Sequence, residues 1–315
     1  MSTYSGILNI LKPPGMTSHD AVAAVRRLLP GTRAGHTGTL DPWAAGVLPV
    51  CLGRATRLAR FITDDRKEYL AWAVLGLATD SGDTFGRVLS QKEAGAVTPA
   101  VLAQVMARFT GRQWQVPPMT SAVKKGGRPL YALARRGIEV EREARPVEIY
   151  SLRLLETALT AGPRPMILLE VVCSKGTYIR TLIDDAGAAL GCGACMAFLL
   201  RTAVGPYRLE TSFTLEELAH AVLKESVAEI IVTMDTALAA FPVVEAAGGA
   251  ARAVASGAVL YPPGVLAAPA GLVHGQVVRL HGPQGLVAVA EAVVEDGPGG
   301  ARTLFRPVAV LVQDA

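Results

Sequence analysis

The sequence predicts an α+β protein with a mixed, mainly antiparallel sheet and flanking helices, followed by a small barrel-like β domain. Three observations lead to this prediction. The chain has 315 residues, half of them apolar, which is enough for about two domains. Candidate strands and helices follow one another without a strict βαβ rhythm, which argues against a doubly wound nucleotide fold. From about Phe241 the composition changes to short alternating runs rich in Gly, Ala, Val and Pro.

Four helices are predicted in the first part, in order along the chain. Residues 18–29, "SHDAVAAVRRLL", have apolar residues at helical spacing behind a Ser18 cap, and Pro-Gly follows. Residues 98–111 have a threonine cap, a proline in the first turn and a final glycine. A short helix is expected near 130–136, and residues 177–191 form a longer one that ends at a glycine.

Strands are predicted between these helices. Residues 67–77, "KEYLAWAVLGL", alternate well enough for a strand and are followed by a glycine-bearing turn. Residues 147–156 and 165–174 give two more, and the second is nearly all apolar, so we expect it to lie in the middle of the sheet. A capped connector helix over 214–224 follows, and we place the domain boundary between residues 240 and 241.

The net charge of +4 is unevenly distributed. The segment from Phe241 onward contains four arginines, no lysine and five acidic residues, so the positive excess belongs to the first 240 residues. This excess fits either an anionic partner or a solvated basic surface.

Several function classes lack support. No apolar run is long enough to span a bilayer and no signal pattern is visible, so we expect a cytoplasmic protein without membrane contact. Cys192 and Cys195 form a C-x-x-C pair without a second pair or a nearby histidine, so we expect core thiols and no metal site. Phosphate-loop, dinucleotide, zinc-hydrolase and nucleophile-elbow motifs are absent, and we expect no cofactor.

The segment "AGHTGTLDPWAAG" places one histidine and one aspartate in a run of glycine, threonine and proline. Gly35 and Gly38 permit backbone angles closed to other residues, and Pro42 fixes the backbone just after Asp41. Such a segment can hold a carboxylate at the edge of a cleft. An Asx turn before a helix is the competing interpretation, and the local pattern alone favours it.

Five motifs in order resemble the bacterial TruB family of tRNA pseudouridine synthases, from about Gly6 to Tyr207. They are "LNILKPPGMTSHDAV", "GHTGTLDPWAAGVLPVCLGRATR", "TDSGDTFG", "QVPPMTSAVKKGGRPLYALARRG" and "CSKGTYIRTLIDDAGAALGCGA". The resemblance implies a catalytic domain over 1–240, an RNA-clasping insertion near 112–145 and a PUA-like RNA-binding domain over 241–315. It also implies isomerisation of uridine 55 in the T-arm of tRNA by a monomer that needs neither cofactor nor obligate protein partner.

The resemblance assigns catalytic roles to three residues. Asp41 matches the nucleophile, which attacks either the base or the sugar carbon; a carboxylate can both attack and leave again. Arg180, in "GTYIRT", matches its ionic partner, since a nearby cation favours the charged form of a carboxylate. Tyr69, in "KEYL", matches the tyrosine that stacks on the target base and takes the proton from C5. Without the resemblance, Arg180 would read as a surface residue and Tyr69 as a core residue.

Other matches concern binding of the RNA. His36 matches the histidine that fills the place of the flipped base. Tyr178 and Leu199 match positions that line the uridine pocket, whereas Lys12 is equally consistent with a structural role. The insertion brings basic residues that we expect to contact phosphates: Lys124, Lys125 and Arg128. One departure is Thr120, which replaces the usual tyrosine of the insertion and removes an aromatic ring there.

Two other functions remain open at this point. An RNA-guided synthase of the archaeal and eukaryotic type shares the catalytic domain, although the "DPWAAGVLP" context is of the bacterial kind. A tRNA-folding protein without turnover would keep the fold, but it does not need the three catalytic matches.

Overall fold

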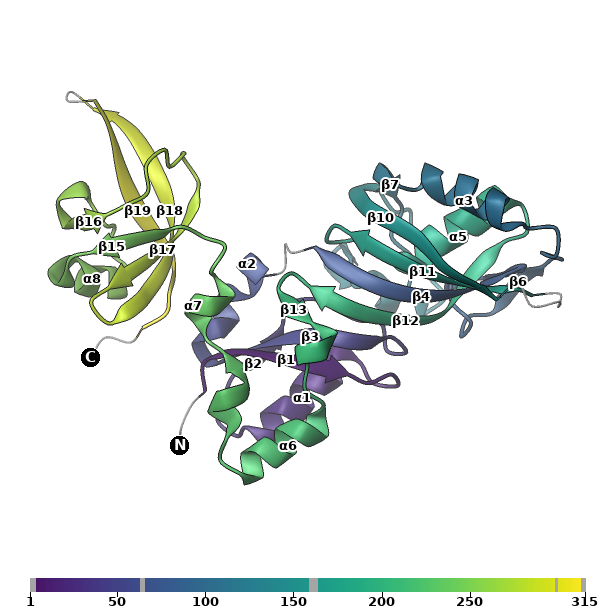
Figure 1. Ribbon diagram of the computed structural model, residues 1–315, viewed down its shortest axis with the longest axis horizontal. Helices are drawn as coiled ribbons and strands as arrows, with labels where there is room; N and C mark the ends of the chain where they lie inside the picture. The colour runs from purple at the N-terminus through teal and green to yellow at the C-terminus, as the bar shows by residue number, and fades with distance from the viewer. Residues whose placement is uncertain (1–3, 63–65, 159–163, 298–299, 313–315) are drawn as a thin grey trace.

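The computed structural model describes residues 4–62, 66–158, 164–297 and 300–312. It contains a large ten-stranded sheet and a separate five-stranded sheet near the C-terminus. Figure 1 shows the two sheets at opposite sides of the molecule, with α2 (Ala59–Ile62) and α7 (Met234–Ala237) between them. The predicted α+β class with a C-terminal sheet domain is therefore confirmed, while the boundary between residues 240 and 241 stays a prediction.

The large sheet is mixed and mainly antiparallel, as predicted. Only the contact of β3 with β12 is parallel among the strand pairs described for it. Along the sheet the strands are β14 (Ile231–Val232), β1 (Gly6–Lys12), β3 (Ala45–Leu52), β12 (Ala194–Val204), β4 (Lys67–Leu75), β11 (Met166–Cys173), β10 (Arg145–Ala158) and β7 (Gly111–Gln115), with β2 (Ala34–His36) beside β3 and β13 (Tyr207–Arg208) beside β12.

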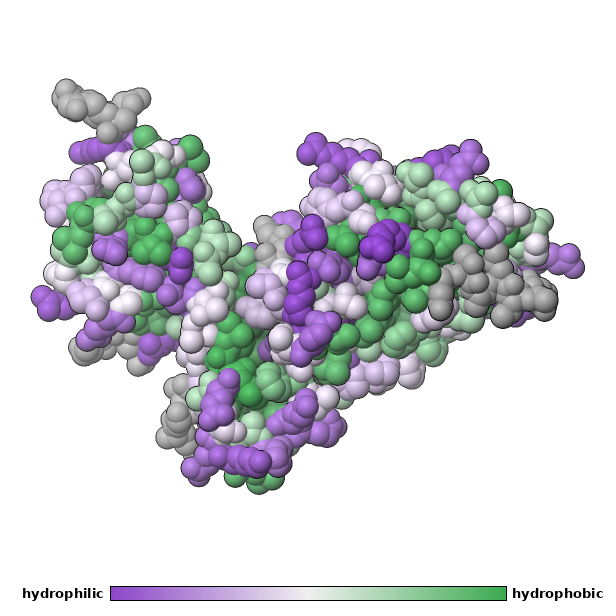
Figure 2. Space-filling model, in the orientation of Figure 1, coloured by the Kyte–Doolittle hydropathy of each residue, from purple (hydrophilic) through white to green (hydrophobic). Residues whose placement is uncertain are grey.

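Two pairs of helices cover different parts of this sheet. Helices α1 (Ser18–Leu28) and α6 (Leu215–Leu223) bury their apolar sides with β1 and β3. Helices α3 (Pro99–Arg108) and α5 (Ile179–Leu190) do the same over β4 and β11. The outer side of α6 carries polar side chains (Figure 2). Helices α3 and α5 therefore pack against β4, the strand that carries Tyr69.

The cap of α1 differs from the prediction. The N-cap is Thr17, whose hydroxyl accepts from the amide of Asp20 while the Asp20 carboxylate accepts from the Thr17 amide at 3.0 Å. Ser18 is buried instead, and its hydroxyl accepts from the amide of Leu40 at 2.8 Å. The capping box fixes the start one residue earlier and frees Ser18 to tie α1 to the segment before Asp41.

The predicted strand over 67–77 is broken at Gly76. This glycine has φ +79°, and a Cβ there would lie 2.3 Å from the carbonyl oxygen of Lys92. Beyond it the chain forms β5 (Leu77–Thr79), which pairs with β6 (Val88–Gln91) in a small sheet. The remaining short elements are η1 (Gly53–Leu58), β8 (Lys124–Lys125), β9 (Arg128–Pro129), α4 (Leu130–Ala134), η2 (Leu209–Thr211) and η3 (Val227–Ile230).

The C-terminal sheet packs against the beginning of the chain. Its strands are β16 (Val265–Ala267), β15 (Val243–Ala246), β17 (Val277–Gly282), β18 (Gly285–Gly297) and β19 (Gly300–Val310), accompanied by α8 (Gly248–Ala255) and η4 (Pro262–Gly264). Val289 and Leu311 share a buried cluster with Ile7 of β1. Arg54 and Arg60 donate to the carbonyls of Leu311 and Val308 at 3.2 and 3.0 Å.

Candidate active site

Asp41 lies in the segment between β2 and β3, which is fixed by backbone hydrogen bonds. The amide of Ala44 donates to the main-chain carbonyl of Asp41 at 3.1 Å. The turn is therefore a backbone turn before β3 and not the Asx turn before a helix that the local pattern favours, since the Asp41 carboxylate bonds Arg180 instead. The carbonyl of Pro42 accepts from the amide of Gly15 at 2.9 Å. The backbone on both sides of the carboxylate is thus held by other parts of the fold.

Arg180, on α5, donates two parallel hydrogen bonds to the Asp41 carboxylate. Its Nε donates to Oδ2 at 2.8 Å and its Nη2 donates to Oδ1 at 3.1 Å. The guanidinium is 4% exposed, whereas the carboxylate is 33% exposed. A bidentate pair of this kind fixes orientation as well as charge. Asp41 therefore presents an open, oriented carboxylate on a buried cationic support.

The other N–H groups of Arg180 are also bonded. Nη1 donates to the Ser81 carbonyl at 2.9 Å and to the Thr120 hydroxyl, and Nη2 donates to the Thr120 carbonyl at 3.3 Å. Asp83 adds a second carboxylate 3.9 Å from Nη1. The sequence analysis linked Thr120 only to the RNA-clasping insertion. In the structure its hydroxyl takes part in holding the arginine that holds Asp41.

Lys12 lies completely buried beneath the Asp41 segment. Its ammonium donates to the carbonyls of Pro13 and Met16 at 2.8 Å each and to that of Pro42 at 3.2 Å. Burial lowers the pKa of Lys12 to about 8, with the Asp41 charge acting in the opposite direction. This position favours a structural role over contact with RNA.

Arg201, on β12, is a second buried cation beneath the same segment, and the sequence analysis missed it. It is 1% exposed and donates to the carbonyls of Val47 at 2.7 Å, Gly38 at 3.2 Å and Thr39 at 3.4 Å. The sequence does carry a signal for it, because Arg201 is the one charged residue in the apolar run "MAFLLRTAV". A charged residue in a buried strand must have hydrogen-bond partners, since such residues are almost never fully buried without them.

Tyr69, on β4, lies directly opposite Arg201 in the register of β4 and β12. It is 6% exposed. Burial raises the pKa of Tyr69 to about 12, and the Arg201 guanidinium opposes the shift. In the free protein this side chain is a neutral phenol at neutral pH. Arg201 is the group beside it that stabilises a phenolate.

His36, at the end of β2, is half-buried. Burial lowers its pKa from the ordinary value, and the charge of Arg201 lowers it further. Its Nδ1 has no hydrogen-bond partner among the described residues. His36 is therefore a neutral, planar ring at neutral pH, which is the form suited to stacking on a base.

Two predicted lining residues lie on the elements that carry the site. Leu199 is buried on β12, paired with Ala71. Tyr178 is the N-cap of α5; its side chain makes no capping hydrogen bond, and its amide donates to Oε1 of Gln115 at 2.8 Å. Tyr178 thus fixes the start of the helix two residues before Arg180.

The basic residues of the insertion lie on the β8–β9 hairpin. Lys124, Lys125 and Arg128 are all exposed, and the Lys125 ammonium donates to the carbonyl of Glu141. The structure shows no hydrogen bond between this hairpin and Asp41 within the described ranges. The hairpin connects to the site through the segment that contains Thr120.

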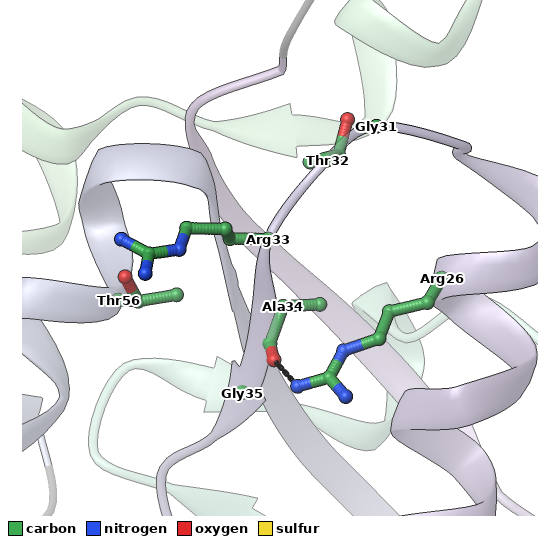
Figure 3. A pocket seen from close by; sticks show the side chains of 7 residues that line it. All are labelled: Arg26, Gly31, Thr32, Arg33, Ala34, Gly35 and Thr56. Carbon is green, nitrogen blue, oxygen red and sulfur yellow. Dashed lines mark hydrogen bonds between the residues drawn. The ribbon is translucent and has the colours of Figure 1, made fainter.

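A basic pocket of about 640 Å³ lies beside the predicted stacking histidine. Figure 3 shows its lining residues on α1, on the loop between α1 and β2, on β2 and on η1. Arg26 and Arg33 supply its charge, and Nη2 of Arg26 donates to the carbonyl of Ala34 at 2.5 Å. Among the described residues no carboxylate forms an ion pair with either arginine. Strand β2 leads from this pocket to His36.

The described ranges contain no group of three or more His, Cys, Asp or Glu side chains placed to hold a metal ion. They also contain no helix that is both long and apolar enough to cross a bilayer. All four cysteines are buried, including Cys192 and Cys195.

Comparison with known proteins identifies the family. Residues 26–179 match the profile of the TruB family pseudouridylate synthase N-terminal domain, and residues 180–239 match that of the tRNA pseudouridylate synthase B C-terminal domain. The chain is 48% identical over 311 residues to tRNA pseudouridine synthase B of Pelotomaculum thermopropionicum, covering 99% of this chain and 98% of that protein. The chain belongs to the TruB family.

Another relative and a solved structure are also similar to this chain. The synthase B of Symbiobacterium thermophilum is 56% identical over 218 residues, which cover 69% of this chain and 72% of that protein. Among solved structures, that of a Cbf5–Nop10–Gar1 complex superposes with a TM-score of 0.75 at 32% identity, covering 98% of this chain and 85% of that one.

Proposed function

We propose that this protein is a tRNA pseudouridine synthase that isomerises uridine 55 in the T-arm loop, with Asp41 as the nucleophile. The observation that carries the proposal is the Asp41–Arg180 pair, in which a one-third exposed carboxylate rests on a buried, fully bonded guanidinium. Membership of the TruB family supplies the reaction class, and relatives that match almost the whole chain are named tRNA pseudouridine synthase B.

The chemistry needs a carboxylate that can attack and then leave. The glycosidic bond from N1 breaks, the base turns, and a new bond joins the ribose carbon to C5. The hydrogen on C5 leaves as a proton, N1 takes up a proton, and Asp41 returns to its free ionised form. Attack on the base and attack on the sugar both use the same carboxylate lone pair, and Arg180 holds it in one orientation.

Tyr69 and Arg201 are assigned to the last proton transfer. The raised pKa of Tyr69 makes its phenolate a strong base once it forms, and Arg201 lies opposite it to stabilise that charge. Because the free side chain is protonated at neutral pH, we infer that its phenol gives its proton to N1 of the detached base, which must gain one, before the phenolate accepts the proton from C5.

The RNA is held by groups around this centre. We assign His36 to the gap left by the flipped base, and Tyr178 and Leu199 to the walls of the uridine pocket. The exposed hairpin residues and the Arg26–Arg33 pocket supply counter-charges for phosphates. We also propose that residues 241–315 act as a PUA-like RNA-binding domain, and that the protein works in the cytoplasm as a monomer without a cofactor.

Release of tritium from C5-labelled uridine in T-arm RNA tests the proposal. We expect release by the unmodified protein and loss of at least about 10⁴-fold in Asp41→Asn, because the amide keeps the shape of the side chain but not its nucleophilicity. No release by the unmodified protein would overturn the function. Full activity of the variant would overturn the role of Asp41.

An RNA-guided synthase is the second candidate, favoured by the similarity to the Cbf5–Nop10–Gar1 structure. Relatives named synthase B match at 45 to 56% identity, against 32% for that chain. We therefore expect turnover of T-arm RNA by the purified protein alone. Turnover only after addition of a guide RNA and accessory proteins would favour the second candidate.

A further inference from the structure

Two aromatic side chains stack on each other at the protein surface and are exposed to solvent. The rings of Trp43 and Phe85 have centroids 4.6 Å apart and an interplanar angle of 12°. Even in this contact Trp43 is 51% exposed and Phe85 is 59% exposed. Burial of apolar area is worth roughly 25 cal/mol per Å², so two adjacent exposed rings leave a favourable contact unmade.

The stacked pair lies at the rim of the proposed active site. Trp43 follows Asp41 by two residues, and Phe85 follows Asp83 by two residues. Asp83 is 3.9 Å from the Arg180 guanidinium that holds Asp41. The two rings thus come from the two segments that flank the Asp41–Arg180 pair.

Both segments hold their rings in fixed positions. The Phe85 amide donates to Oδ1 of Asp83 at 3.0 Å, and the amide of Thr84 donates to the carbonyl of Met196 on β12 at 2.9 Å. On the other side, Pro42 is tied to Gly15 and to the buried ammonium of Lys12. A flat surface on rigid supports costs little conformational entropy when a second flat group stacks on it.

We propose that the Trp43–Phe85 pair is a stacking platform for an RNA base next to the target uridine. This inference rests on the proposed function. A base that leaves its stack also exposes the faces of its neighbours, and aromatic side chains are the usual partners of unstacked bases in RNA. Each ring of the pair covers only one face of the other, so an outer face remains for one base.

The position of the pair favours a base over an apolar protein segment. The platform continues directly into the site proposed for the uridine, and its border is charged. Asp80 and Arg87, in the same turn as Phe85, form an exposed ion pair at 3.7 Å. Two rings inside a polar border fit a flat base with polar edges better than an extended apolar surface.

Binding measurements with an inactive background test the platform. Affinity for T-arm stem-loop RNA is measured in Asp41→Asn, alone and combined with Trp43→Ala, Trp43→Phe or Phe85→Ala. We expect Trp43→Ala to raise Kd roughly 5- to 150-fold, the range for loss of one base–aromatic stack, and Trp43→Phe to retain most of the affinity. The matched control is Tyr150→Ala, which removes another ring, 47% exposed on β10, and is expected to leave Kd unchanged.

RNAs with a single abasic ribose separate stacking from a purely structural role. If Trp43 stacks on a base, one abasic loop position removes the difference between the background protein and Trp43→Ala, while the other positions preserve it. An equal loss for every RNA would show that the rings only join two segments and would overturn the platform. If Trp43→Ala left Kd for RNA unchanged but altered the sedimentation coefficient of the protein, the rings would form a contact between two copies of the chain. That result would also overturn the platform.

This test can fail independently of the proposed function. Tritium release by the unmodified protein reports the reaction, whereas the abasic series reports stacking alone. Normal release without any position-specific effect would therefore reject the platform and leave the synthase assignment intact.

Discussion

The segment from His36 to Pro42 and the β8–β9 hairpin are both predicted to meet RNA, but the fold supports them in opposite ways. Beneath the first segment lie Lys12 and Arg201, which are 0% and 1% exposed and bonded to backbone carbonyls. The hairpin presents its cations to solvent. The fold therefore uses buried cations to fix the group that is proposed to react, and it leaves exposed the cations that are proposed to contact phosphates.

Burying the cations of Lys12 and Arg201 destabilises the fold unless each N–H group donates a hydrogen bond to an acceptor. An unpaired cation in the interior costs several kcal/mol, while one bonded to three carbonyls recovers much of this. Lys12 and Arg201 each have three such carbonyls. Misplacement of a catalytic group by about 1 Å can cost about 100-fold in rate. If Asp41 is the nucleophile, as proposed, we expect loss of the rigid support beneath it to lower the rate of turnover.

The largest effect is expected at Arg180. Arg180→Lys keeps the charge but loses the two parallel bonds to Asp41 and the bonds to Thr120. We expect kcat to fall by at least about 10³-fold while Kd for RNA changes little, since Lys is not equivalent at a bidentate site. Single-turnover rates and RNA titration measure the two quantities. An equal loss of binding and rate would contradict this role.

Removal of Arg201 is expected to damage stability first. Arg201→Met fills similar space but leaves the carbonyls of Gly38, Thr39 and Val47 without their donor. We expect a loss of about 3 kcal/mol in the free energy of unfolding, measured in urea. Arg153→Met is the control, because Arg153 lies in an exposed ion pair with Glu170. Equal effects of the two changes would refute the support role.

Thr120 offers a finer test of the same support. Thr120→Val removes the hydroxyl that accepts from Arg180 and leaves the shape unchanged, whereas Thr120→Ser keeps the hydroxyl. Loss of one charged hydrogen bond predicts a fall in kcat of about 10-fold for Val and little change for Ser. The account would be wrong here if Ser and Val behaved alike.

Substitutions in the β8–β9 hairpin should affect RNA binding and not stability, unlike substitutions beneath the segment from His36 to Pro42. In the double variant Lys124→Glu with Lys125→Glu, we expect a KM for RNA about 10-fold higher, unchanged kcat, and an unchanged midpoint of thermal unfolding, since exposed cations act on phosphates through screened attraction. The slope of log Kd against log salt should also become shallower. A changed unfolding midpoint would show that the hairpin has a structural role.

The smallest effect is a titration of Tyr69. Because burial raises its pKa to about 12, its phenol keeps its proton in the folded protein between pH 10 and 12, while an unfolded tyrosine loses it. This group's contribution to stability is therefore complete below pH 10 and is lost as the pH rises toward 12. At pH 11, folded Tyr69→Phe should show the same phenolate absorbance at 295 nm as the unmodified protein. A lower absorbance in Tyr69→Phe than in the unmodified protein would contradict the raised pKa.

The sequence predicts the fold best where local chemistry decides. Helix α3 begins at Pro99 behind the cap Thr98, and α5 ends before Gly191, whose φ is +79°. The sequence does not reveal the break at Gly76 because the two features that require glycine there, φ +79° and the close approach of the Lys92 carbonyl, arise only in the folded chain.

The candidate site was predictable only in part. Asp41 and Arg180 are 139 residues apart, and the resemblance rather than any local pattern linked them. Arg201 escaped because its partners are backbone carbonyls, which every residue carries and no motif marks. The contact of Thr120 with Arg180 escaped because the two residues are 60 positions apart. Trp43 and Phe85 likewise meet only when two distant segments come together in the fold.

Site-resolved mapping of pseudouridine in a full-length tRNA transcript is the most direct test of the central claim. The transcript is incubated with the purified protein or with Asp41→Asn, and each uridine is then examined. The account predicts complete conversion at position 55 of the T-arm by the unmodified protein and none by the variant. Conversion at another position, or equal conversion by both proteins, would contradict it.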